Sequence, residues 1–130
     1  MRIDILTLFP EMFAGPFDAS IIKRARDSGL VQIVFRNLRE WGLGRHRTVD
    51  DYPYGGGAGM VMRPEPLCEA IDAARTEMGG SPRIVLLTPQ GRLFSQQVAN
   101  DLAAEEKLLL VCGHYEGVDE RVREHAVTDQ

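Results

Sequence analysis

The sequence predicts an α/β fold in which a parallel β-sheet is covered by helices on both faces. Short runs of apolar and β-branched residues alternate along the chain with segments that carry apolar residues at helical spacing. This alternation is typical of strand–helix–strand units with right-handed crossovers. The strand runs are apolar at most positions, as expected for strands that are buried on both faces. With 130 residues and 44% hydrophobic content, the chain is long enough for one domain with one core.

The first elements are predicted to be a strand, a helix and a second strand. The strand covers residues 3–9, which are mostly apolar and stop at a proline. The helix covers residues 20–28, with Ser20 as its N-cap and Gly29 as the residue that ends it. Apolar and polar residues then alternate over residues 31–35, which predicts the second strand.

A long connection separates these elements from the rest. Residues 36–63 show little periodicity, and they far exceed the roughly two to six residues that usually join a strand to a helix. An ordered connection of this length is usually functional. A helix then begins at Pro64 and ends before Gly79, and two apolar strands are predicted over residues 84–87 and 108–112.

Two further helices complete the predicted order. Ser95 is a suitable N-cap for a helix that runs to about Ala104, with Val98 and Leu102 on its inner face. Asp119 can begin a last helix.

Two turns that contain glycine directly follow apolar strands. They are residues 88–91 (TPQG) and residues 113–117 (GHYEG). Because ligands of parallel sheets bind at the carboxyl ends of the strands, we expect the two turns to lie together at that edge. Tyr115 supplies a stacking face and Glu116 a carboxylate, which suits an adenine nucleoside. A turn of this composition with a purely structural role is also common, so the pattern alone leaves both interpretations open.

The long connection contains a dense run of glycines at residues 54–60 (YGGGAGM). It follows a loop, does not match GxGxxG and is not followed by a P-loop lysine, which argues against a dinucleotide site or a P-loop. Glycines are retained where φ is positive or where a backbone approaches a planar ligand closely. A flexible connection is the alternative.

The charge of the chain places limits on its partners. The formal net charge of −4 argues against a protein whose whole surface grips phosphate. Basic residues do gather locally, opposed only by Glu40, and a solvated loop and a local RNA contact remain equally open. This group consists of Arg36, Arg39, Arg45, His46 and Arg47.

Other classes of site lack a recognisable pattern. Cys68 and Cys112 stand far apart without zinc-binding spacing or an obvious partner base, and no Ser-His-Asp pattern is identifiable. Asp50 and Asp51 near His46 are more typical of a solvated loop than of a metal site. No signal peptide or membrane-spanning run is evident, so we expect a soluble cytoplasmic protein.

Four runs of residues together resemble the bacterial tRNA (guanine-N1)-methyltransferase family of the knotted SPOUT superfamily. They are IDILTLFPEMF at residues 3–13, HRTVDDYPYGGGAGM at 46–60, LTPQG at 87–91 and CGHYEGVDERV at 112–122. The runs occur in the family's order and at similar spacing across almost the whole chain. Each run is modest alone, but the ordered set is highly specific.

The resemblance implies methyl transfer from S-adenosylmethionine to N1 of the guanosine 3′ of the anticodon in tRNA. It also implies a homodimer whose active sites lie between subunits, and a cofactor bound in a deep trefoil knot. Residues 1–130 would be the amino-terminal S-adenosylmethionine-binding domain. Carried over from the family, the cofactor-binding residues are Leu87, Thr88, Pro89, Gly113, Tyr115, Glu116 and Gly117. The substrate-binding residues are His46, Asp50, Tyr54, Gly55, Gly56, Gly57 and Gly59.

The same resemblance implies that no catalytic residue lies within residues 1–130. Attack by guanine N1 on a methyl group is helped by a base that removes the N1 proton. The family's base is an aspartate that we expect beyond Gln130, together with the third cofactor loop, the threading segment of the knot and the tRNA-binding domain. We therefore expect this chain alone to be inactive. The alternatives are a noncatalytic nucleotide- or RNA-binding module and a flavodoxin-like interaction domain.

Overall fold

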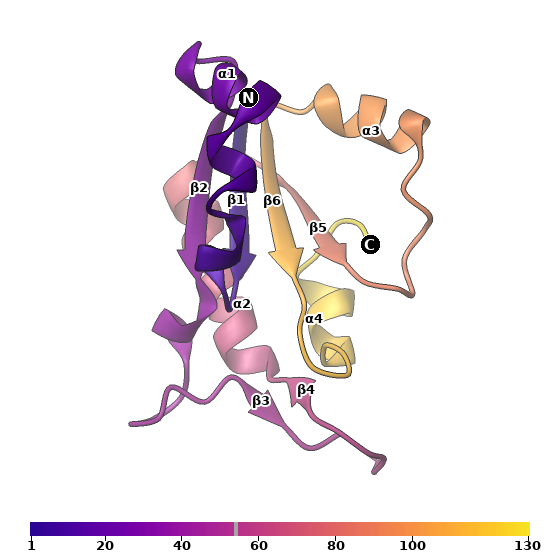
Figure 1. Cartoon of the computed structure of the whole chain (residues 1–130). Coiled ribbons are helices and arrows are strands. Elements are labelled where there is room, and N and C mark those ends of the chain that lie inside the picture. The colour runs from indigo at the N-terminus through magenta and orange to yellow at the C-terminus, as the bar shows by residue number, and fades with distance from the viewer. Residues whose placement is uncertain (54) are drawn as a thin grey trace.

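Four parallel strands form the sheet of this protein, which we describe from a computed structural model that covers residues 1–53 and 55–130. The strands are β1 (Arg2–Thr7), β2 (Gln32–Asn37), β5 (Arg83–Leu87) and β6 (Lys107–Cys112). They lie in the order β2-β1-β6-β5, so β6 enters between β1 and β5 (Figure 1). The predicted α/β fold with a parallel sheet is confirmed.

One face of the sheet is covered by α2 and holds most of the buried residues. Helix α2 (Pro64–Met78) begins at its predicted proline, and its residues Leu67, Ala70, Ile71 and Ala74 are fully buried. They pack in one cluster with alternate strand residues such as Leu6, Leu86 and Leu109, and with Val122 of α4 (Glu120–His125). This face contains the hydrophobic core, and we refer to it below as the covered face.

The opposite face, here called the open face, is covered only in part. Helices α1 (Ser20–Asp27) and α3 (Gln96–Ala103) accompany it, and neither contains a fully buried residue although both are described in full. A cavity of about 350 Å³ separates α1 from Ile3, Ile5 and Leu110. A second cavity of about 600 Å³ lies between α3 and the β5–β6 pair. In Figure 1, α3 stands away from the sheet.

Three predicted details in the first part of the chain are wrong. Ala19, not Ser20, is the N-cap of α1, and no side chain of the described chain caps this helix because Ser20 itself has φ +55°. The first strand ends at Thr7 instead of residue 9, because the Thr7 Oγ1 accepts a hydrogen bond from the Phe9 amide at 3.1 Å and turns the chain. The second strand extends to Asn37, two residues further than predicted.

The long connection contains more structure than its sequence indicates. It includes the 3₁₀ helix η3 (Leu38–Trp41) and a short antiparallel pair, β3 (Asp50–Asp51) with β4 (Val61–Met62). Leu38, Val49 and Met62 anchor the connection in the covered core. Two further 3₁₀ turns, η1 (Pro10–Phe13) and η2 (Pro16–Asp18), precede α1.

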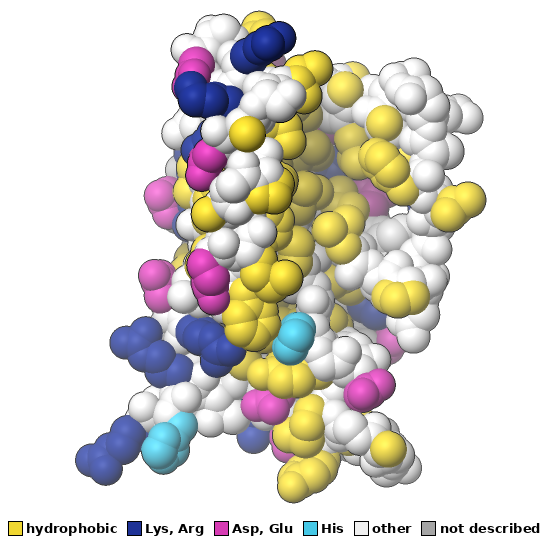
Figure 2. Space-filling view, in the orientation of Figure 1, with side chains coloured by type: hydrophobic (Ala, Val, Ile, Leu, Met, Phe, Trp, Pro, Cys, Tyr) yellow, Lys and Arg dark blue, Asp and Glu magenta, His cyan; other side chains and the backbone are white. Residues whose placement is uncertain are grey.

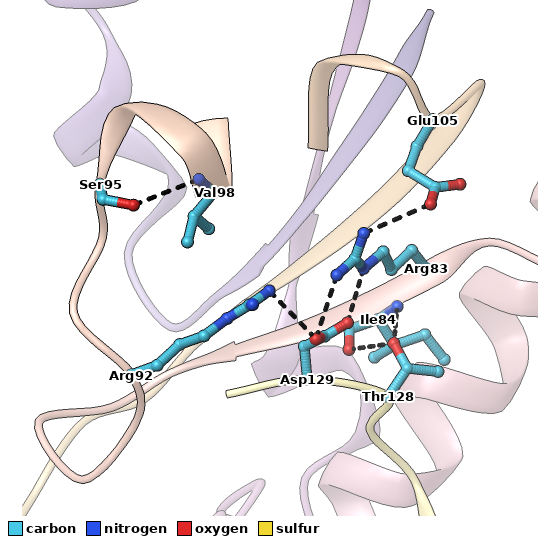
Figure 3. A network of polar contacts seen from close by, with 8 residues as sticks. All are labelled: Arg83, Ile84, Arg92, Ser95, Val98, Glu105, Thr128 and Asp129. Carbon is cyan, nitrogen blue, oxygen red and sulfur yellow. Dashed lines mark hydrogen bonds and ion pairs between the residues drawn. The ribbon is translucent and has the colours of Figure 1, made fainter. Parts of the chain in front are cut away.

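The last residues of the chain lie along the free edge of β5. The Leu86 amide donates to the Asp129 carbonyl at 3.0 Å, and Val85 and Asp129 form a parallel bridge. Arg83 fixes this contact by donating to the Asp129 carboxylate from Nε at 2.6 Å and from Nη2 at 3.2 Å (Figure 3). Figure 3 also shows the predicted cap of α3, in which Ser95 Oγ accepts from the Val98 amide at 3.3 Å. None of the described helices has the length and apolar character that crossing a membrane requires.

Candidate functional site at the carboxyl edge of the sheet

The two predicted turns meet at the carboxyl edge of the sheet, as expected. Leu87 pairs with Cys112 at the ends of β5 and β6, so both turns begin side by side. A Cβ on Gly113 would lie 3.7 Å from the Leu87 carbonyl oxygen. The first turn is closed by a hydrogen bond of 3.1 Å from the Gly91 amide to the Thr88 carbonyl.

Strand β4 holds the second turn in place. The Glu116 amide donates to the Met60 carbonyl and the Met62 amide donates to the Gly117 carbonyl, both at 2.9 Å. The His114 amide also contacts the Met62 sulfur at 3.3 Å. Tyr115 has φ +61°, a conformation that costs a residue with a side chain roughly 1–2 kcal/mol. The surrounding hydrogen bonds maintain this conformation, and the residue is 38% exposed.

The glycine-rich loop and the second turn touch through Gly59 and Glu116. A Cβ on Gly59 would lie 2.2 Å from Cγ of Glu116, and Gly59 has φ +85°. Only glycine is compatible with this position, because a side chain would require both a strained backbone and displacement of Glu116. The sequence predicted that a planar ligand approaches the backbone of the glycine run. At Gly59 the group that approaches the backbone is the side chain of Glu116.

The other residues of the predicted substrate loop extend into open space. Gly55, Gly56 and Gly57 all have positive φ, and a Cβ on any of them would meet no described atom within 4 Å. Tyr54 lies outside the described residues. Asp50 is half-buried in β3, and its carbonyl accepts from Arg63 Nε at 2.9 Å.

His46 is exposed at the tip of a tight loop. Leu43 and Thr48 close this loop with two backbone hydrogen bonds of 2.8 and 2.9 Å. The structure thus brings Gly59 and Asp50 towards the second turn through β4. No contact of His46 with either turn is seen in the described chain.

The larger open-face cavity adjoins the first turn. Leu87, Thr88 and Pro89 line it, together with apolar side chains of α3 and the preceding segment. The residues of the second turn, 113–117, do not line it. Apolar walls with a few polar groups suit the base and ribose of a nucleoside. The predicted cofactor residues therefore converge at one edge, but only those of the first turn open into the cavity.

The predicted basic group loses one member. Arg36 is buried, and its guanidinium donates to Asp4 Oδ2 and Glu77 Oε2, each at 2.7 Å. Asp4 is itself completely buried and also accepts two hydrogen bonds from Arg2. Arg36 is therefore a structural cation that cannot contact RNA, because β2 extends through it and turns its side chain towards α2.

The pKa values of two groups at this edge are shifted by their surroundings. Burial raises the pKa of the Cys112 thiol at the end of β6, which disfavours thiolate chemistry there. Arg121 lowers the pKa of Asp119 by donating to its carboxylate at 2.9 Å, and Asp119 caps α4 as predicted. Among the side chains that the structure describes, no three His, Cys, Asp or Glu residues form a group suited to a metal ion.

Sequence reasoning missed Phe9, Met62 and Val118 at this edge. Phe9 contacts His114 with ring centroids 5.1 Å apart, and Met62 and Val118 form the bridge that joins β4 to the second turn. Apolar residues carry no chemical signature of a site. For Phe9 and Val118, their position inside two of the recognisable motifs was the only signal, and Met62 lies two residues beyond the motif at 46–60.

Comparison with known proteins places this geometry in a defined group. Over residues 1–130 the chain matches the family described as tRNA (Guanine-1)-methyltransferase TrmD. A tRNA (guanine-N(1)-)-methyltransferase of Pelotomaculum thermopropionicum is 60% identical over 131 residues, which cover 100% of this chain and 52% of that protein. A relative of the same name from Desulforudis audaxviator is 64% identical over 95% of this chain and 50% of its own length.

A solved structure shows the same arrangement. The crystal structure of a tRNA (m1G37) methyltransferase from Aquifex aeolicus matches with a TM-score of 0.85 and 39% sequence identity. The match covers 95% of this chain and 56% of that one. The chain spans about half the length of the curated relatives that it matches.

Proposed function

Since this chain belongs to the tRNA (guanine-1)-methyltransferase family, we propose that it provides the cofactor turns and the guanosine-facing loop of an S-adenosylmethionine-dependent tRNA methyltransferase. The reaction would transfer a methyl group to N1 of the guanosine 3′ of the anticodon. The supporting observation is the pairing of Leu87 with Cys112, which sets both predicted cofactor turns at one edge, with Gly59 of the loop against Glu116.

The residues at this edge fit S-adenosylmethionine. When bound, this cofactor supplies a sulfonium methyl group that a nucleophile can take. Leu87, Thr88 and Pro89 would contact its apolar parts from the wall of the cavity. Gly113 and Gly117 leave room for it, and the exposed face of Tyr115 is free to stack.

Glu116 has a separate role in this proposal. Its amide is tied to Met60 and its side chain lies against Gly59, so it links the cofactor turn to the guanosine-facing loop. We assign proton removal from guanine N1 to none of the residues 1–130. The family's aspartate in the second half of the relatives would perform it.

The cofactor assignment is tested by adding one methyl group where the protein tolerates it. A Cβ on Gly113 would meet Val118 Cγ2 at 3.5 Å and the Leu87 oxygen at 3.7 Å, which are ordinary contacts. Gly113→Ala in the protein extended through its second half is therefore expected to fold normally and to bind S-adenosylmethionine at least tenfold more weakly by calorimetry. Circular dichroism and thermal unfolding of Gly113→Ala beside the unmodified protein control for effects on folding. Unchanged affinity of Gly113→Ala would remove this turn from the cofactor site.

Activity is tested by transfer of radiolabelled methyl groups from S-adenosylmethionine to unmodified tRNA. The extended protein is expected to methylate the guanosine 3′ of the anticodon, and residues 1–130 alone are expected to bind without turnover. Turnover by residues 1–130 at a comparable rate would place the base within them, with Asp50 and Glu116 as the candidates. RNA binding by the extended protein without turnover would favour a noncatalytic RNA-binding module.

We also propose that the protein forms a homodimer, because apolar side chains on and beside the open face are exposed to solvent. Ile21 is 76% exposed, Leu87 50% and Phe94 69%. Monomeric proteins rarely leave a large contiguous apolar surface uncovered. Light scattering of the extended protein should give the mass of a dimer. A monomeric mass at high concentration would contradict this assignment.

A further inference from the structure

Four side chains form a continuous row at the carboxyl edge of the sheet. The ring centroids of Phe9 and His114 are 5.1 Å apart, and those of His114 and Tyr115 are 4.7 Å apart, both in edge-to-face arrangements. The Arg39 guanidinium carbon lies 5.4 Å from the centroid of the Phe9 ring. We call Arg39, Phe9, His114 and Tyr115 the cation–aromatic row.

The row joins two parts of the candidate site. Phe9 follows β1, His114 follows β6 and Arg39 lies in η3 directly after β2. Because the strand order is β2-β1-β6-β5, the row crosses the ends of three neighbouring strands. Its Tyr115 end belongs to the second turn, and its Arg39 end leads into the loop that carries the exposed residues 45–47.

The exposure of the row distinguishes it from ordinary packing. His114 is exposed, and Phe9 and Arg39 are half-buried at the surface. Figure 2 shows cationic and histidine side chains next to apolar surface at the lower end of the molecule, where the strands end in Figure 1.

The charge on Arg39 is also available to a partner. Within the described chain, the Arg39 guanidinium forms no ion pair, whereas the nearby Arg36 is buried between two carboxylates. A planar guanidinium without a carboxylate partner, in a row that ends in the exposed rings of His114 and Tyr115, has the groups that bind a nucleotide. Arginine pairs with phosphate oxygens, and aromatic rings stack on unpaired bases.

We propose that the cation–aromatic row binds a nucleotide adjacent to the target guanosine, with its base against the His114 ring and its phosphate on Arg39. This inference rests on the proposed function and adds positioning residues to it. A stacked neighbour holds the RNA backbone on one side of the target, so that the guanosine can leave its stack and enter between the loop and the second turn.

The test uses the protein extended through its second half and an anticodon stem-loop RNA. 2-Aminopurine replaces the nucleotide on either side of the guanosine, so that stacking is detected as quenched fluorescence. For one of the two positions, the unmodified protein is expected to quench the probe. His114→Ala is expected to abolish the quenching and to weaken RNA binding about tenfold. His114→Phe keeps an aromatic ring and should retain both the quenching and the RNA affinity.

Arg39→Ala tests the phosphate contact. It is expected to weaken RNA binding and to lower the slope of log affinity against log salt concentration by about one. Arg24→Ala is the matched control, because Arg24 is an exposed arginine of α1 at the other end of the molecule. This control should leave quenching unchanged and should not reproduce the loss of affinity.

Two further measurements make the outcomes distinct. Calorimetry with S-adenosylmethionine should show less than a twofold change for His114→Ala and Arg39→Ala. An equal loss of cofactor and RNA affinity would mean that the row only shapes the second turn, which overturns the proposal. If the unmodified protein transfers methyl groups normally but both variants keep unchanged quenching and salt slope, the proposed nucleotide contact of the row is overturned and the proposed function stands. Absence of methyl transfer by the unmodified protein overturns the proposed function, and the inference falls with it.

Discussion

The two faces of the sheet differ greatly although the same strands build both. On the covered face, Leu6 and Leu109 are completely buried under α2, which contributes six buried residues. On the open face, the neighbouring Leu110 lines both cavities. Helices α1 and α3 have eight residues each and bury none completely, as the fully described helices show.

This difference separates stability from function within one sheet. The covered face holds a closed core, in which apolar burial and close packing stabilise the fold. The open face keeps apolar surface accessible, and the cavity beside Leu87 and Pro89 lies there. The proposed cofactor turns begin where these two environments meet, so a rigid core positions a surface that is still able to bind.

The largest expected loss of stability comes from a substitution on the covered face. Leu109→Ala should lower the free energy of unfolding by about 4 kcal/mol, because it removes a completely buried side chain and leaves a cavity. Leu110→Ala is the matched change on the same strand. It should cost only about 1 kcal/mol, because Leu110 is half-buried and already borders empty space. Urea denaturation followed by circular dichroism gives both values, and equal losses would show that the two faces are packed alike.

A second change tests the polar part of the covered face. Asp4 is completely buried and joins Arg2 to Arg36, whose Nη2 is buried without a partner among the described residues. Asp4→Asn should lower the free energy of unfolding by about 3 kcal/mol, because it leaves a buried guanidinium with less compensation.

Glu77→Gln provides the comparison for this network. Glu77 also pairs with Arg36, but its side chain is 64% exposed, so its loss should cost less than about 1 kcal/mol. Urea denaturation of Asp4→Asn and of Glu77→Gln gives the two losses to be compared. A small loss for Asp4→Asn would mean that water reaches the Arg36 guanidinium from the side of β2.

The smallest expected effect concerns the edge of β5 and depends on pH. Arg83 lowers the pKa of Asp129 below its ordinary value, with Arg92 adding to the effect. The carboxylate therefore contributes stability above the unfolded pKa of about 3.9, and this contribution disappears as the pH falls through the lower folded pKa. Asp129→Asn should cost about 1 kcal/mol at neutral pH and should reduce the loss of stability as the pH falls below about 4.

Urea denaturation at a series of acidic pH values gives the free energy of unfolding of this variant and of the unmodified protein as a function of pH. The curves should converge at low pH, where Asp129 is protonated in both states. A constant difference down to the lowest pH would show that the effect arises from packing of the last residues instead of from charge.

The sequence alone determined the four strands of the sheet, the main helices and the family. Apolar periodicity identified the strands and α2, because burial on a sheet or beneath a helix requires apolar residues at fixed spacing. The glycines of residues 55–59 and the turn at 113–117 indicated the site, and the ordered motifs carried the resemblance. These features are local, since each depends on the residues next to it in the chain.

Only the tertiary structure decided which residues meet. The sequence grouped Arg36 with the exposed basic residues, but pairing of β2 with β1 places it against Asp4. It gave no sign that Phe9 would contact His114, 105 positions further along the chain, or that Gly59 would touch Glu116. It also could not distinguish Leu109 from Leu110, because both are leucines in one apolar strand. The arrangement of helices around the sheet fixes these contacts, and it depends on long-range packing that no local pattern records.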